Sequence, residues 1–253
     1  FFGECVCSDV CGPFATSPNG FQLAICFHDK YSKHNAVYFL PRGDGPAIKS
    51  AIQTYTADHQ KWLKDGKVHT WLCDDAMHFH AKEVDQLCME LGTRQTFSVP
   101  HVSQKHGAAE RVWATLLGPS NRMLAWAGND TVRETLWPFL LTHACQIHNS
   151  LPTLALDPPT SPWEKVTGNK PDLTVYENKV PLSDCWVRLV YKQDLLNKGH
   201  KLKPKNVQAV YLCYDWRRRG DFVYIPELNR ITTVFHVFHK PREFMKLGEP
   251  IKF

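Results

Sequence analysis

The chain has 253 residues, which is enough for one large domain or for a domain of about 150 residues with a smaller one. Hydrophobic residues make up 43% and charged residues 22%, a composition that excludes a mainly disordered or collagen-like chain. The net charge of +5 is unevenly spread. Residues 181–253 hold 14 of the 30 Lys and Arg residues but only seven of the 25 acids, so this segment could face a polyanion.

The first half of the chain alternates between short apolar runs and segments with helical spacing. Runs bounded by turn residues predict strands, and apolar residues three to four apart predict helices. The predicted strands are 4–11, 21–28, 36–40, 68–73 and 93–97, and the predicted helices are 46–63, 81–91, 108–127 and 131–149. A polar loop is predicted at 98–107, and Gly118-Pro119 should break or kink its helix.

The order of these elements is β-β-β-α-β-α-β-loop-α-α. It predicts an α/β fold with a mixed five-stranded sheet flanked by helices, as in the RNase H-like fold. A doubly wound nucleotide-binding fold would need strict βα alternation and a Gly-rich first turn. We expect a core at 1–151, a Pro/Thr-rich linker at 152–181, a small basic β module at 182–240 and a tail at 241–253. The strands of the module are expected at Trp186–Tyr191, Val207–Tyr214, Phe222–Ile225 and Ile231–Phe238.

The nine cysteines are odd in number and their spacing forms no disulfide framework. Without a recognisable signal peptide, this pattern favours a reduced, intracellular setting. Cys5 and Cys7 are expected on opposite faces of their strand, which argues against a zinc site. The charge-free stretch 135–156 contains histidines and prolines, so it is interpreted as a buried helix and its exit, and no membrane span is expected.

Three acids could act together although each alone would usually be a surface or capping residue. Asp9 lies on the first strand, Asp74 follows the fourth strand, and Glu110 begins the helix after the polar loop. The first and fourth strands of an RNase H-like sheet are neighbours, so these carboxylates can meet at one edge. Grouped carboxylates repel unless a cation lies between them, and Mg²⁺ or Mn²⁺ prefers such oxygen ligands. Two such ions would support phosphodiester chemistry.

Other polar and aromatic side chains have two open interpretations. Arg217, Arg218 and Arg219 lie between two predicted strands, where they form either a solvated hairpin tip or a phosphate contact. The same alternatives hold for Lys201, Lys203 and Lys205. His78 and His80 are expected near the surface and not as metal ligands. The tryptophans on predicted helices are expected in the core: Trp113, Trp126 and Trp137.

A series of short motifs, in order along the chain, resembles the integrase region of copia-type LTR retrotransposon Pol polyproteins, within the retroviral-type integrase family. The matching segments are Ser8-Asp9-Val10-Cys11-Gly12-Pro13, Asp29-Lys30-Tyr31-Ser32-Lys33, Cys73-Asp74-Asp75-Ala76, Ser98-Val99-Pro100, Gln104-Lys105-His106-Gly107-Ala108-Ala109-Glu110-Arg111, Arg122-Met123-Leu124, Asn149 with Pro152, Thr160 with Pro162, Gly168-Asn169-Lys170-Pro171, and Val210-Tyr211-Leu212-Cys213-Tyr214-Asp215. The 35 residues between Asp74 and Glu110 also match the family spacing.

The resemblance implies that Asp9, Asp74 and Glu110 form the catalytic, metal-binding triad, with two Mg²⁺ or Mn²⁺ ions. It implies two reactions: trimming of the 3′ ends of the element's DNA with water, and joining of those ends to target DNA. DNA contacts are expected from Gln104, Lys105, His106, Arg111 and the three hairpin arginines. Implied partners are element-end DNA, target DNA, further copies of the chain, and the protease and reverse transcriptase segments of a longer polyprotein, in a cytoplasmic particle and the nucleus.

Two departures from the family pattern keep alternatives open. Asp75-Ala76 stands where Asn-Gly is usual, so Asp75 competes with Asp74 for the middle acid position; the motif alignment favours Asp74. The helix after Arg111 continues with uncharged residues where the family usually has basic ones. A catalytically decayed or host-recruited remnant that binds DNA or protein is therefore the main alternative. A hybrid-specific ribonuclease is a second.

Overall fold

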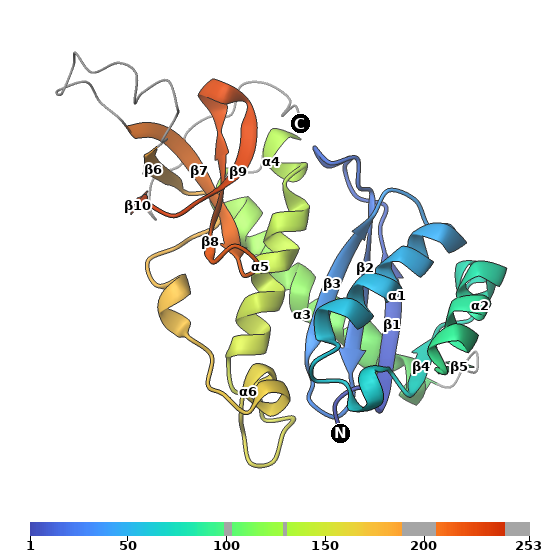
Figure 1. The fold of residues 1–253 in the computed structure, drawn as a ribbon. Coiled ribbons are helices and arrows are strands. Elements are labelled where there is room, and N and C mark those ends of the chain that lie inside the picture. The colour runs from blue at the N-terminus through green and yellow to red at the C-terminus, as the bar shows by residue number, and fades with distance from the viewer. Residues whose placement is uncertain (99–102, 129–130, 189–205, 241–253) are drawn as a thin grey trace. The chain divides into compact units, whose positions relative to one another are not determined.

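The computed structural model describes residues 1–98, 103–128, 131–188 and 206–240; for 103–110 and 131 it describes the backbone alone (Figure 1). The chain divides into two compact units. The first comprises Phe1–Ser120 with Ala144–Asp172, and the second comprises Asn121–His143 with Leu173–Phe253. The domain limits expected at residues 151 and 181 remain a prediction. No helix among the described residues has the length and apolarity that crossing a bilayer requires.

The first unit contains a five-stranded mixed sheet. Its strands lie in the order β3-β2-β1-β4-β5. They are β1 (Cys5–Cys11), β2 (Leu23–Asp29), β3 (Asn35–Leu40), β4 (Thr70–Cys73) and β5 (Arg94–Phe97). The first three pair antiparallel, while β4 runs parallel to β1 and β5 parallel to β4. The predicted RNase H-like sheet is confirmed, including the predicted pairing of the first and fourth strands.

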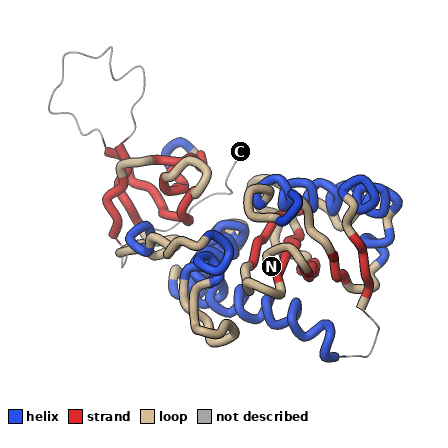
Figure 2. Tube along the Cα trace, turned by 60° about the horizontal axis from the view of Figure 1, so that its bottom comes forward, coloured by secondary structure: helices blue, strands red, loops and turns tan. Residues whose placement is uncertain are grey.

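Helices flank this sheet, and Figure 2 shows α1 (Gly45–His59) and α2 (Lys82–Leu91) on the side opposite the start of α3 (Ser103–Trp126). Asp44 caps α1 by accepting the Ala47 amide at 3.0 Å. Helical spacing brings Ile48, Ile52 and Tyr55 onto one face. There the ring of Tyr55 packs against Phe27 at 4.8 Å between centroids, at the centre of the core. Short 3₁₀ turns occupy Lys64–Gly66 and Met77–His80.

Two of the matched motif residues hold this sheet together. The buried Asp29 carboxylate accepts the Ser32 amide and hydroxyl at 2.7 Å each and the Gly3 amide at 2.8 Å. Asn149 pairs with the edge strand β3: its Oδ1 accepts the Asn35 amide at 2.9 Å and its Nδ2 donates to the Asn35 carbonyl at 2.7 Å. Both residues satisfy buried backbone groups, which explains their value to the fold.

The polar loop expected at 98–107 is wrong over residues 103–107, and Gly118-Pro119, which was expected to break or kink the helix, does not break it. The helix α3 begins at Ser103 and continues through Pro119 to Trp126. Ala108, Ala109 and Glu110 favour helix strongly, and Gly107 costs only about 1 kcal/mol. Near Pro119, the side chains of Leu116 and Ser120 are buried, so packing outweighs the hydrogen bond that proline removes. Residues 99–102 lie outside the described chain.

The segments after α3 also differ from expectation. The helix expected at 131–149 is two helices, α4 (Thr131–Glu134) and α5 (Trp137–Ser150). The interruption falls just before Pro138, which is tolerated only in the first turn of a helix. The expected linker contains the helix α6 (Pro162–Thr167), capped by Ser161, and a 3₁₀ turn at Leu173–Tyr176.

The second unit contains an antiparallel five-stranded sheet in the order β10-β6-β7-β8-β9. Its strands are β6 (Asp184–Arg188), β7 (Asn206–Asp215), β8 (Gly220–Ile225), β9 (Arg230–Val234) and β10 (Val237–Lys240), with a 3₁₀ turn at Pro226–Leu228. The small β module is therefore confirmed. Of its expected first strand, residues 189–191 lie outside the described chain, as do Lys201, Lys203, Lys205 and the tail 241–253.

The expected single strand at Ile231–Phe238 is wrong, because it is two strands at opposite edges of the sheet. Val234 ends β9, and Val237, three residues later, begins β10 against β6. The sheet must curl strongly to bring its two edges this close. The curl encloses Val187, Tyr211 and Val223 on its inner side, and it gives the β6 edge a partner strand. Ile231–Phe238 is rich in β-branched and aromatic residues and contains no Gly or Pro, so its sequence does not mark the bend at Phe235-His236.

Two further side-chain expectations are corrected. Trp126 is 60% exposed, whereas Trp113 and Trp137 are buried as expected. Cys5 and Cys7 share one face, because residues two apart on a strand point the same way. A hydrogen bond from Cys7 lowers the pKa of the Cys5 thiol to about 7. All nine cysteines fall within the described chain and all are free thiols.

Candidate functional site

The parallel ladder between β1 and β4 brings Asp9 and Asp74 to neighbouring positions. Its last registered pair is Ser8 with Cys73, whose buried side chains approach to 3.4 Å between Oγ and Sγ. Asp9 is the next residue of β1, and Asp74 is the next residue after β4. Both are half-buried. The two acids therefore occupy neighbouring positions towards the C-terminal ends of both strands.

Backbone amides help to orient each carboxylate. The Val10 amide donates to Asp9 Oδ1 at 2.9 Å, and the Ala76 amide donates to Asp74 Oδ1 at 3.4 Å. Partial burial and carboxylate oxygens are the conditions that suit a hard divalent cation such as Mg²⁺ or Mn²⁺. The donor set of this pair fits such an ion.

The rival acid, Asp75, has a different environment. Its side chain is 56% exposed and is hydrogen-bonded to His80 Nε2 at 2.8 Å, and the His80 ring stacks on Phe97. His80 is therefore exposed as expected. His78 is half-buried, and burial lowers the pKa of its imidazole while the nearby Asp74 carboxylate acts in the opposite direction. Asp75 is thus engaged at the surface, and Asp74 is the acid next to Asp9.

Glu110 lies in the third turn of α3, and not at the helix start as expected, because α3 begins at Ser103. Its side chain lies outside the described ones. The chain that leads to α3 leaves the sheet at the same end as the acid pair, because the Ser98 amide continues the ladder by donating to the Cys73 carbonyl at 3.0 Å. Five residue steps then separate Ser98 from the start of α3, a span of at most about 18 Å. Among the described side chains, no three of the His, Cys, Asp and Glu type converge.

The expected DNA contacts near the acids all lie on α3. Gln104, Lys105 and His106 occupy its first two turns instead of a loop, and their side chains lie outside the described ones. Arg111 is exposed, whereas Val112 and Trp113 after it are buried. The apolar residues in this part of α3 therefore pack inside the protein. Arg111 is the cation whose side chain the structure describes at the surface here.

The three hairpin arginines form an exposed turn between β7 and β8. Asp215, which is buried, accepts the amides of Arg217 and Arg218 at 3.1 and 3.2 Å and the Thr233 hydroxyl at 2.7 Å. These hydrogen bonds to Asp215 fix the backbone of the turn, so the arginine side chains start from fixed positions. The Arg218 guanidinium also donates to the Thr233 hydroxyl at 3.3 Å. The position as a hairpin tip is confirmed, and a phosphate contact stays a prediction.

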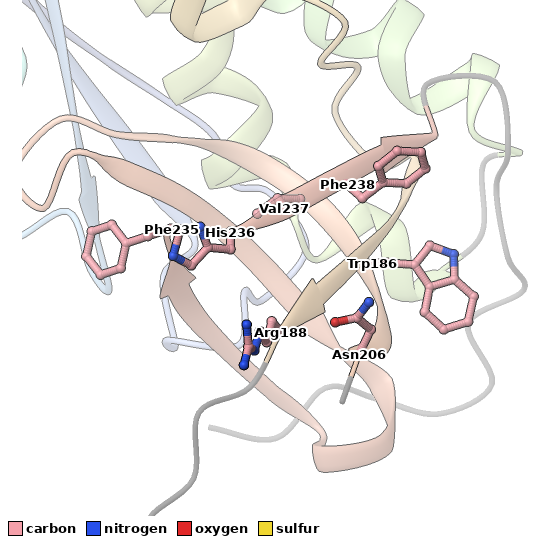
Figure 3. A pocket seen from close by; sticks show the side chains of 7 residues that line it. All are labelled: Trp186, Arg188, Asn206, Phe235, His236, Val237 and Phe238. Atoms are coloured by element: carbon pink, nitrogen blue, oxygen red, sulfur yellow. The ribbon is translucent and has the colours of Figure 1, made fainter. Parts of the chain in front are cut away.

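Sequence reasoning missed a pocket on the second sheet (Figure 3). Its lining residues are Trp186, Arg188, Asn206, Phe235, His236, Val237 and Phe238. The signal was present: Cys185 and Val187 are apolar, so alternation sends Trp186 and Arg188 to the other face of β6.

Comparison with known proteins gives distant relatives. No family model matches the chain. The chain is 27% identical over 165 residues to a retrovirus-related Pol polyprotein from transposon TNT 1-94 of Nicotiana tabacum, covering 63% of this chain and 12% of that polyprotein. It is 24% identical over 215 residues to the corresponding polyprotein from transposon RE1 of Arabidopsis thaliana, covering 83% and 13%. The chain thus spans about an eighth of these relatives, which confirm the resemblance to transposon Pol polyproteins.

A solved structure supports the fold alone. The chain is 14% identical to a chain in the structure of the simian T-cell lymphotropic virus intasome in complex with PP2A regulatory subunit B56 gamma. The match covers 98% of this chain and 79% of that chain, with a TM-score of 0.53.

Proposed function

We propose that this chain is the integrase core and following β module of a copia-type retrotransposon polyprotein. It carries out metal-dependent 3′-end processing and strand transfer of element DNA into target DNA. The observation that carries the proposal is the placement of Asp9 and Asp74 directly beyond the registered pair Ser8–Cys73. The chain also leaves the sheet at this end, after Ser98, before it enters the helix that contains Glu110.

The three acids have one shared role in this proposal. Asp9, Asp74 and Glu110 hold two divalent ions, Mg²⁺ or Mn²⁺. When bound, such ions activate an attacking oxygen and stabilise the leaving oxygen of a phosphodiester. The Val10 and Ala76 amides keep the Asp9 and Asp74 carboxylates oriented, so that little rearrangement is needed when DNA binds.

DNA is held by cations on both units. Arg111, with Gln104, Lys105 and His106 on the same helix, is assigned to the DNA near the acids. Arg217, Arg218 and Arg219, on the second unit, are assigned to other phosphates of the DNA. The three acids on the strands of the second sheet do not oppose these arginines at the surface, because Asp184, Asp215 and Asp221 are all buried. The proposed partners are element-end and target DNA, further copies of the chain and the other segments of the polyprotein, in a cytoplasmic particle and the nucleus.

The test is a strand-transfer assay with an oligonucleotide that copies the element's own end, a supercoiled target plasmid, and Mg²⁺ or Mn²⁺. The wild-type chain should produce joined products, and Glu110→Gln should produce none, because a neutral amide is a poorer ligand for these ions. Unchanged circular dichroism of the variant serves as the folding control. Joined products from Glu110→Gln would exclude the triad.

A decayed or host-recruited remnant is the second candidate. The burial of Val112 and Trp113 directly after Arg111 favours it, because this stretch of α3 contributes packing and no cations. A wild-type chain that binds the oligonucleotide but yields no product with either ion would support this candidate.

A further inference from the structure

The outer face of β6 and β10 carries a cross-strand pair of exposed aromatic rings. Trp186 lies directly opposite Phe238, while the neighbouring pair of Val187 and Val237 lies on the other face. Trp186 is 36% exposed and Phe238 is 68% exposed. Large apolar rings that remain in water next to one another are typical of a binding surface.

These rings line an open pocket of about 470 Å³ (Figure 3). The pocket volume falls within the range of about 300–1,000 Å³ that is usual for sites of small ligands. Phe235, which is 68% exposed, adds a third ring from the turn between β9 and β10. The site is thus built from β6, β7 and β10 and from the turn between β9 and β10.

The polar groups of the pocket are cationic or neutral. Arg188 and His236 line it together with the Asn206 amide, and Lys240 Nζ lies 5.9 Å from the Trp186 ring centroid. No acid lines the pocket among the described residues. The nearby Asp184 is buried and accepts a hydrogen bond from Gln208 at 3.3 Å.

This combination selects one class of occupant. A cationic ligand such as a methylated lysine would be repelled by Arg188 and Lys240. A purely apolar peptide segment would remove water from Arg188 and Asn206 without giving them hydrogen-bond partners, which is energetically unfavourable. An unpaired nucleotide satisfies both requirements, because its base stacks on an aromatic ring and its phosphate pairs with a cation.

We propose that this pocket, on the face of β6 and β10, binds single-stranded nucleic acid by stacking an unpaired base on Trp186 and Phe238, with Arg188 at the phosphate. The proposal extends the proposed DNA function but does not depend on the acids. Binding is therefore measured with the full chain in EDTA, without any transfer reaction. A failure of this pocket and a failure of the triad are then distinguishable.

The experiment compares two fluorescent single strands of about 12 units, within the site sizes of about 4–16 nucleotides known for single-strand binders. One is oligo-deoxythymidine, and the other has the same phosphates but abasic sugars. The wild-type chain should bind the thymidine strand more tightly. Trp186→Ala should weaken that binding at least about fivefold, which corresponds to about 1 kcal/mol for one stacked base. It should leave binding of the abasic strand unchanged.

Matched variants separate stacking from other effects. Trp186→Phe should restore most of the binding, because it keeps a ring. Arg188→Gln should weaken binding of both strands and reduce the salt slope by about 0.7, the value for one phosphate on a single strand. Trp126→Ala, which removes another exposed tryptophan, should change neither affinity.

Three outcomes would overturn the proposal. They are equal wild-type affinity for both strands, equal losses for both strands with Trp186→Ala, and Trp186→Phe no better than Trp186→Ala. If Trp186→Ala instead dissociates an oligomer in sedimentation and leaves strand binding unchanged, the pocket is an interface between copies, which also overturns it.

Discussion

Asp9 lies one residue beyond Ser8, and Asp74 lies one residue beyond Cys73, where Ser8 and Cys73 form the last registered pair of the parallel ladder between β1 and β4. The relationship depends on backbone pairing and not on side-chain attraction. Like charges that lie close together repel unless a cation lies between them, which is why the proposed function assigns a divalent ion to this pair.

Removal of one partner from the buried ion pair of the second unit should strongly destabilise the protein. Asp221, which is buried, accepts two contacts from Lys179 at 2.7 and 3.0 Å and one from His239 at 3.2 Å. Asp221→Asn should lower the free energy of unfolding by about 3–5 kcal/mol, because the Lys179 charge would remain buried without its partner. Urea denaturation measures this change.

The matched control is Asp65→Asn, which removes an exposed acid 3.7 Å from His69 and should change the free energy of unfolding by less than about 1 kcal/mol. Adding Lys179→Met to Asp221→Asn should recover part of the loss. Equal changes in the free energy of unfolding for Asp65→Asn and Asp221→Asn would contradict a stabilising role of the Asp221 ion pair.

Burial of His143 predicts a loss of stability in acid. Burial lowers the pKa of its imidazole from 6.5 to about 4. As the pH falls, the unfolded chain therefore binds the proton before the folded chain does. The stability that comes from keeping His143 neutral is fully present above pH 6.5 and is lost as the pH falls towards 4. The slope is about 1.4 kcal/mol per pH unit at most. The free energy of unfolding is to be measured between pH 7 and 5 for the wild-type chain and His143→Phe.

His143→Phe keeps an aromatic ring beside Tyr176 and Tyr211 but cannot titrate. The variant should lose less stability between pH 7 and 5 than the wild type. Other buried histidines with a lowered pKa, such as His34 and His59, titrate in both proteins and so cancel in the comparison. If the free energy of unfolding changes equally with pH in both proteins, His143 does not contribute to the pH dependence of stability.

Pro119 gives a prediction of increased stability. Since α3 continues through it, Pro119→Ala restores the amide that can donate to the Thr115 carbonyl. The free energy of unfolding should rise, by up to about 3 kcal/mol. Pro46→Ala is the control, because Pro46 lies in the first turn of α1, where no such hydrogen bond exists. Destabilisation by Pro119→Ala would mean that the proline ring packs favourably.

The hairpin arginines predict a salt dependence. Replacing Arg217, Arg218 and Arg219 with Ala should lower the slope of log affinity for duplex DNA against log salt by up to about three contacts, at roughly 0.9 each. The turn should persist, since Asp215 holds it through backbone amides. Arg42→Ala, an exposed arginine of the first unit, should leave the slope unchanged. An unchanged slope for the triple variant would mean that the three arginines contact solvent and not DNA phosphates.

The sheet of the first unit was predictable because each strand is a short apolar run bounded by turn residues, and the motif order then aligned Asp9 with Asp74. The start of α3 was not, because the polar residues of Ser103–His106 are equally typical of a loop and of an exposed helical turn. Local propensity failed at Pro119, where the burial of Leu116 and Ser120 outweighs it, so tertiary packing decided that case.

The second sheet shows a different limit. Ile231–Phe238 is one run rich in β-forming residues, yet Val234 pairs with β8 and Val237 pairs with β6, so β9 and β10 lie at opposite edges, and only the curl of the whole sheet determines this. The pocket around Trp186 depends on the same closure. By contrast, the shared face of Cys5 and Cys7 follows from strand periodicity alone and was open to correct prediction.

The most direct test of the central claim is strand transfer by Asp74→Asn and Asp75→Asn, compared side by side with the wild-type chain in Mg²⁺ and Mn²⁺. The two variants remove one negative charge each at adjacent positions, so they are matched in chemistry and in net charge. Asp74→Asn should yield no joined product, whereas Asp75→Asn should retain activity, because Asp75 is paired with His80 at the surface. Full activity of Asp74→Asn, or loss of activity confined to Asp75→Asn, would contradict the proposed metal centre.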